Sequence, residues 1–190
     1  MSPPSPTDAD ISRLTRDLAR ACLVEGLEPE AFRVAVSIQL FSKPFSELID
    51  TSVLDRVPEP MHTVVAIVLF DTVLAMEGLL TTLGNSSGHH MPLFADALER
   101  IDSHGDAGRV RTVLAILAEH GTSPRRLRET AVQREQYAVT TFAATHPDQP
   151  RAFSARISAI DSAISDDHSD DLARWLGARW VELRALAEGP

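Results

Sequence analysis

Of the side chains in this sequence, the histidines are the clearest candidates for metal binding or catalysis. His89 and His90 are adjacent, His104 follows further along, and His168 stands among aspartates. Imidazole and carboxylate groups are ligands that zinc and other divalent ions accept. Adjacent histidines lack the i, i+4 spacing that directs two imidazoles at one ion. We therefore predict no metal ligands, and keep a small metal-dependent hydrolase with its centre near His89, His90 and His104 as an alternative.

Ser86 and Ser87 precede the histidine pair, separated from it by Gly88, and could form a nucleophile–base pair with His89 or His90. The G-x-S-x-G elbow that exposes such a serine is missing from the sequence. The glycines at 105 and 108 enclose a segment too short for a phosphate-binding loop, and its lysine is missing. We predict no catalytic residue, no cofactor and a non-enzymatic role.

Carboxylates dominate the charge of the chain, with 27 acidic residues against 18 basic ones and a net charge of −9. Direct nucleic-acid binding is disfavoured, since neutralising phosphates requires a surplus of cations. The most acidic stretch is 161–171, and three further acids recur at spacings of three on one predicted helix face. A solvated face with helix-capping aspartates is the alternative to partner binding. The predicted partner-binding residues are Asp161, Asp166, Asp167, Asp170, Asp171, Asp96, Glu99 and Asp102.

One stretch of the chain is basic, with arginines at 125, 126, 128 and 134. It could contact an anionic partner or the acidic face of another subunit. A helix of alternating charges is more often a solvated surface. We favour the solvated surface.

The single cysteine, Cys22, excludes an intrachain disulfide and fits a reducing compartment, so we expect a cytoplasmic protein. Residues 1–8 are rich in proline and lack an apolar stretch, which predicts a disordered lead and no secretory signal. The length of 190 residues suits one domain, which we place at 9–188.

Apolar spacing and breaker residues predict an all-α fold, a multi-helix bundle. Asp8 or Asp10 is expected to cap the first helix, and Gly26 to end it. The basic stretch is predicted to form a helix that Ser123 and Pro124 open. The other helices are expected at about 29–43, 45–57, 61–83, 91–101, 106–120, 125–141, 153–164 and 167–187.

The segment 61–83 is the longest predicted helix, and its first half is apolar on nearly every side. Such a helix belongs at the centre of a helical domain. A strand over 63–70 is the competing interpretation, because Val64, Val65 and Ile67 favour strands. Asp71 argues against a membrane span, since a carboxylate near the bilayer centre costs roughly 2.5–3.5 kcal/mol. We predict a buried central helix and no membrane contact.

A turn tetrapeptide, Asn85-Ser86-Ser87-Gly88, follows this helix, with Gly78 upstream and residues 97–101 (ALERI) downstream. These turn residues end helices readily by themselves. In this context they resemble the DNA-mimic-protein-like family, helical bacterial domains in which an N-G-G-F-type segment leads into an N-S-S-G turn and an A-L-E-x-I-type helix. Gly78 stands at the family's second glycine, while Met76 and Glu77 replace its asparagine and first glycine.

The resemblance implies a helical, often dimeric domain without catalytic activity. The namesake members of the family bind a DNA-binding regulator by presenting carboxylates in place of phosphates. Thirty ångströms of duplex DNA carry roughly 18 negative charges, well above the net charge of −9 of this chain. Only a local acidic patch, or a dimer that aligns two patches, could therefore compete with DNA for a basic partner. We expect a protein-binding domain that engages a basic partner, such as a DNA-binding regulator. An immunity-type protein that neutralises a toxin is the alternative, and a homodimer is possible.

Overall fold

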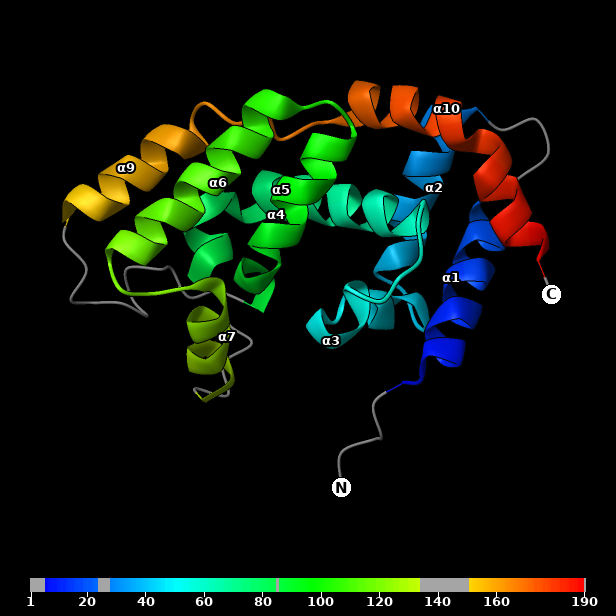
Figure 1. Ribbon diagram of the computed structural model, residues 1–190, viewed down its shortest axis with the longest axis horizontal. Helices are drawn as coiled ribbons and strands as arrows, with labels where there is room; N and C mark the ends of the chain where they lie inside the picture. The colour runs from blue at the N-terminus through cyan, green and yellow to red at the C-terminus, as the bar shows by residue number, and fades with distance from the viewer. Residues whose placement is uncertain (1–5, 24–27, 85, 134–150, 190) are drawn as a thin grey trace. The chain divides into compact units, whose positions relative to one another are not determined.

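The computed structural model describes residues 6–23, 28–84, 86–133 and 151–189, and the regular structure in these ranges is entirely helical (Figure 1). The predicted all-α class is confirmed. The competing strand over residues 63–70 is wrong, because these residues lie inside the helix α4 (Met61–Gly84). Helical spacing continues past Asp71, and the helix runs without interruption up to a break at Gly78.

The chain divides into two compact units. The first combines Met1–Leu69 with His168–Pro190, and the second is Phe70–Asp167. The division falls inside α4, whose residues 61–69 count with the first unit and 70–84 with the second. The expectation of a single domain over 9–188 stays a prediction.

The first unit is built around α10, which packs on both α1 and α2. Phe32 of α2 meets Trp180 of α10 edge to face, with ring centroids 5.6 Å apart. Arg20 of α1 donates hydrogen bonds to the carbonyl oxygens of Ala187 and Gly189 at the end of α10. The elements are α1 (Asp8–Cys22), α2 (Pro29–Leu40), η1 (Phe45–Ile49), α3 (Thr51–Leu54), the first part of α4, and α10 (Ser169–Glu188).

A capping box starts α1, and its cap is Thr7. The backbone N–H of Asp10 donates to Thr7 Oγ1 at 3.2 Å, and the Asp10 carboxylate accepts from the Thr7 backbone N–H at 3.1 Å. The prediction that Asp8 or Asp10 is the cap is wrong. Thr7 is the cap, Asp8 is the first residue of the helix, and Asp10 is the third. Of the predicted lead, 1–5 lie outside the described residues, as does the predicted stop at Gly26.

The helix predicted over 45–57 is interrupted. Asp50 has an extended backbone, with φ −66° and ψ 140°, and separates the 3-10 turn η1 from the single-turn α3. An extended residue cannot continue the i to i−4 hydrogen bonds of an α-helix. The apolar spacing therefore identified the buried side chains Leu48, Val53 and Leu54 but not the break between them.

The second unit pairs α5 with α6, packs α7 on η2, and places α9 against α6. Phe70 of α4 and Phe94 of α5 contact each other in its core, with centroids 5.0 Å apart. The predicted helix over 125–141 is described as far as Gln133. The elements are the rest of α4, η2 (Ser86–His90), α5 (Met91–Arg100), α6 (His104–Glu119), α7 (Pro124–Gln133) and α9 (Arg151–Asp161).

Among the described residues, α4 is the one helix long and apolar enough to cross a membrane. In its most apolar 18-residue window, 67% of the residues are buried inside the protein. Residues 61–70 are all buried, and so are Val73 and Leu74. This burial fits the predicted central helix.

Candidate functional site

The long helix α4 is broken at Gly78, whose φ of 69° and ψ of 169° are not helical. This combination of angles is essentially restricted to glycine, because a Cβ would clash with the backbone. The break starts a second helical segment at Leu79. The first backbone N–H groups of such a segment have no acceptor within the helix.

Asp161, the last residue of α9, supplies an acceptor at the break. Its Oδ1 accepts the backbone N–H of Leu79 at 2.8 Å. A Cβ added at Gly78 would lie 3.0 Å from Asp161 Oδ2, so the carboxylate fills the space that a side chain would need. Thr82 closes the new turn by donating its hydroxyl to the Gly78 carbonyl at 2.8 Å. Asp161 therefore acts as a helix cap provided by a distant part of the sequence.

A pocket of about 290 Å³ opens beside this break, and we call it the Gly78 pocket. Two carboxylates, one hydroxyl and two apolar side chains share its lining, and none of the described lining residues is cationic. Most of the exposed lining is polar, so the arrangement offers hydrogen-bond acceptors to a cation. The lining residues are Leu74, Gly78, Asp161, Ser162, Ile164 and Asp166.

The loop after α9, residues 162–167, is held in place from both ends. Ser162 and Ile164 continue the hydrogen bonding of α9 through their backbone N–H groups. The Ser165 N–H donates to Asp106 Oδ2 at 3.4 Å, and Asp106 Oδ1 accepts from Arg109 at 2.6 Å. Asp106 is 7% exposed and lies in the first turn of α6. This buried carboxylate, which sequence reasoning missed as a site residue, anchors the loop that carries Asp166.

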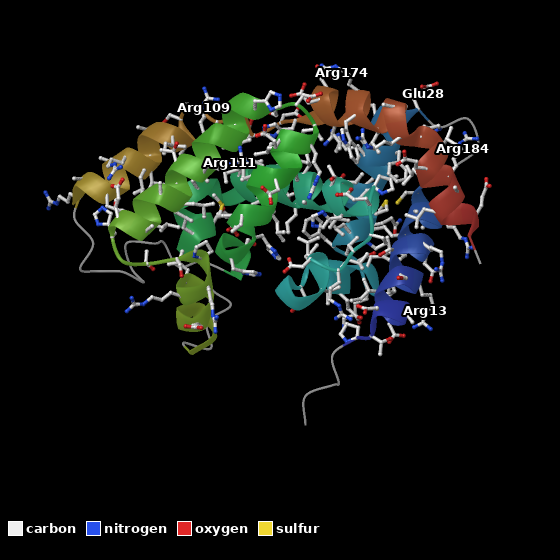
Figure 2. All side chains as sticks on the ribbon, viewed as in Figure 1. Arg13, Glu28, Arg109, Arg111, Arg174 and Arg184 are labelled. Carbon is white, nitrogen blue, oxygen red and sulfur yellow. The ribbon has the colours of Figure 1, made fainter. Side chains whose placement is uncertain are left out.

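The predicted acidic residues 96, 99 and 102 lie around one arginine, Arg111, and one histidine, His104. Arg111 of α6 contacts Glu99 at 2.7 Å and Asp96 at 3.7 Å (Figure 2). His104 lies 2.9 Å from Glu99 and 3.7 Å from Asp102. The hydrogen bond from Arg111 lowers the pKa of Glu99 and raises the pKa of Arg111. This face is thus an ion-pair network, which weakens its attraction for a cationic partner.

The predicted aspartates of 161–171 belong to both units and are described separately. In the second unit, Asp161 and Asp166 line the Gly78 pocket. Asp167, which follows Asp166 in the sequence, is exposed. In the first unit, Asp170 and Asp171 lie in the first turn of α10, where their negative charges interact favourably with the positive end of the helix dipole. Asp171 contacts Arg174 at 3.0 Å, and Asp170 is exposed.

Within the described part of the second unit, the candidate histidines 89, 90 and 104 are not gathered at a metal site. The rings of His89 and His90 lie 3.9 Å apart in η2, and His90 is 2% exposed and packs near Phe94. His104 is half-exposed at the start of α6, among the acids described above. Across the described ranges, no group of three or more histidine, cysteine or acidic side chains is arranged to hold a metal ion.

The predicted family motif has a structural role where it is described. Gly88 lies against the end of α4, and a Cβ there would be 2.9 Å from the carbonyl oxygen of Thr82. Ser86 and Ser87 belong to the 3-10 turn η2, which leads directly into α5. Asn85 lies outside the described residues. Glycine at 88 therefore permits the close approach of η2 to α4, and glycine at 78 permits the break.

Arg125 and Arg126 of the basic stretch are exposed at the start of α7. Ser123 caps this helix by accepting the N–H of Arg126 at 3.3 Å, as predicted. Arg125 pairs with Glu129 at 3.1 Å. Arg134 lies outside the described residues. These contacts fit the predicted solvated face.

No family model, curated protein or solved structure matches this chain. The resemblance to the DNA-mimic-like family rests on the motif residues.

Proposed function

We propose that this chain is a non-enzymatic protein-binding domain that engages a basic partner protein, such as a DNA-binding regulator. The observation that carries the proposal is the Gly78 pocket. Its Asp161 and Asp166 carboxylates lie in one concave site with the apolar side chains of Leu74 and Ile164. Polar groups that converge in a concave site fix the orientation of a bound ligand.

A lysine or arginine side chain of the partner has the matching chemistry. Its aliphatic stem would lie along Leu74 and Ile164, while its charged group would donate hydrogen bonds to the Asp161 and Asp166 oxygens. Oδ1 of Asp161 already accepts the Leu79 N–H, which leaves its Oδ2 and the Asp166 carboxylate for the cation. The net charge of −9 would speed the encounter with a basic protein and make binding sensitive to salt.

Titration with N-acetyl-arginine amide and N-acetyl-lysine amide, followed by amide NMR shifts, tests this proposal. We expect shifts concentrated at Gly78, Leu79 and Ser162, and smaller shifts at high salt. Asp166→Asn should weaken binding by about tenfold, because one of two charge-assisted contacts is lost. Asp170→Asn removes the same charge from the first turn of α10 and should leave the affinity unchanged. Shifts scattered over the surface, or equal losses in both variants, would contradict the proposal.

A further inference from the structure

The described polar side chains of the Gly78 pocket offer a ligand hydrogen-bond acceptors and no donor. Oδ1 of Asp161 is held by the Leu79 N–H, which leaves Oδ2 beside Gly78. The Ser162 hydroxyl donates its hydrogen to the carbonyl of Ser158 at 2.9 Å, so its lone pairs are what it can offer. The carboxylate of Asp166 supplies two further oxygens. A ligand that fits this pocket must therefore be rich in donors.

The number of acceptors distinguishes between the two cationic side chains. Four acceptor oxygens result, one from Asp161, one from Ser162 and two from Asp166. The ammonium group of lysine has three N–H donors, whereas the guanidinium of arginine has five in a planar fork. A lysine therefore leaves at least one acceptor oxygen without a ligand donor. An arginine has a donor for each of the four.

Neither carboxylate of the pocket has a cationic partner among the described residues. Asp161 accepts from a backbone N–H, and no ion pair within the described ranges includes Asp166. The nearby loop anchor differs, since Asp106 pairs with Arg109, which is labelled in Figure 2, at 2.6 Å. The two acids of the pocket thus keep their charge for a cation from another molecule.

The position of the pocket favours a cation, and hydration favours a guanidinium over an ammonium. Asp161 is the last residue of α9, so the pocket lies at the negative end of that helix dipole. An ammonium is a compact, strongly hydrated charge, while a guanidinium is more weakly hydrated. Arginine therefore loses less hydration when it enters a concave site.

We infer that the Gly78 pocket selects an arginine side chain of the basic partner over a lysine side chain. This inference rests on the proposed function, because it names which cation of the partner enters the same site. The guanidinium would donate two parallel N–H bonds to Asp166, and its other N–H groups would donate to Asp161 Oδ2 and Ser162 Oγ. A partner surface that presents lysines alone would bind more weakly.

Dissociation constants for N-acetyl-arginine amide and N-acetyl-lysine amide, taken from the amide shifts of Leu79 and Ser162, test the selection. Wild type should bind the arginine derivative about tenfold more tightly, because one more charge-assisted hydrogen bond is made. Symmetrically dimethylated N-acetyl-arginine amide keeps the positive charge but has three N–H donors, so it should bind like the lysine derivative. Equal affinities for all three would overturn the inference and leave the proposed function standing. No binding of any derivative would overturn both.

Ser162→Ala tests the count of acceptors, because it removes one acceptor oxygen and changes no charge. It should weaken binding of the arginine derivative about tenfold and leave the affinity for the lysine derivative unchanged, so the preference disappears. Ser162→Thr is the matched control, since it keeps the hydroxyl and should keep the preference. Ser162 is exposed directly after α9, so thermal unfolding should be nearly unchanged in both variants. A Ser162→Ala variant that keeps the full preference, or that loses affinity for both derivatives equally, would overturn the inference.

Discussion

The carboxylate of Asp161 accepts the backbone N–H of Leu79 at 2.8 Å, across 82 positions of sequence. This contact ends one helix, α9, and begins another, the second segment of α4. It also fixes one wall of the Gly78 pocket. A single aspartate thereby couples the stability of a helix start to the shape of the proposed binding site.

Gly78→Ala should destabilise the protein by about 1–3 kcal/mol, because alanine would be strained at φ 69° and its Cβ would lie 3.0 Å from Asp161 Oδ2. Urea unfolding measures the change. Gly108→Ala is the control in the same unit, since nothing lies within 4 Å of its added Cβ. That helical substitution should stabilise by roughly 0.5–1 kcal/mol. Equal effects at both positions would exclude a special backbone role for Gly78.

Asp161→Ala should lower the free energy of unfolding by about 0.5–2 kcal/mol, the usual cost of losing a helix cap. Asp161→Asn keeps an acceptor oxygen for the Leu79 N–H and should cost less. Asp166→Ala, in the same pocket but exposed, should change stability by no more than about 0.5 kcal/mol. Chemical denaturation of the three variants gives the order. A loss with Asp166→Ala as large as with Asp161→Ala would refute the capping role.

Acid should remove the contribution of the Glu99–Arg111 pair. The hydrogen bond from Arg111 lowers the pKa of Glu99 below its ordinary value of 4.5. A depressed folded pKa adds stability that is fully present above 4.5 and is lost as pH falls through the folded pKa. Wild type should therefore have a higher melting temperature than Glu99→Gln at pH 6, and this difference in melting temperature should vanish in strong acid. Melting temperatures across this range check the sign, and a constant difference at all pH values would contradict it.

Cys22 should be inert in the folded protein. It is fully buried in α1, and burial raises the pKa of its thiol to about 12. The thiolate is the reactive form, so almost none is present at pH 8. A chromogenic disulfide reagent should label Cys22 slowly in buffer and rapidly in urea. Fast labelling without denaturant would show that this part of α1 opens readily.

Apolar periodicity predicted most of the helices because it reports which side chains are buried. On α2, the periodicity predicts a buried face of five residues: Phe32, Val36 and Leu40 are fully buried, but Ile38 and Phe41 are 68% and 45% exposed. The same periodicity could not show the break at Gly78, since a glycine within a helical pattern is compatible with an unbroken helix. Nor could it show the interruption at Asp50, because apolar residues stand within four positions on both sides, Ile49 before it and Val53 and Leu54 after it.

The candidate site was harder to predict, because its geometry depends on contacts distant in sequence. Asp161 was expected to bind a partner directly, but its role as the cap of Leu79 depends on how α9 packs near α4. Glu99 was expected on an open acidic face, and Arg111 from the next helix neutralises it. Charge counts along the sequence do not reveal which charges meet in the fold.

The contact of Arg20 with the end of α10 has a consequence for the order of assembly. The first unit needs α10, yet the whole second unit, residues 70–167, lies in the sequence between α10 and the rest of the first unit. At about 5–20 residues per second, α1 and α2 leave the ribosome several seconds before their partner helix. The second unit is continuous in sequence and can be completed in that interval. The nascent chain must therefore keep the apolar faces of α1 and α2 from aggregating until synthesis reaches Ala187.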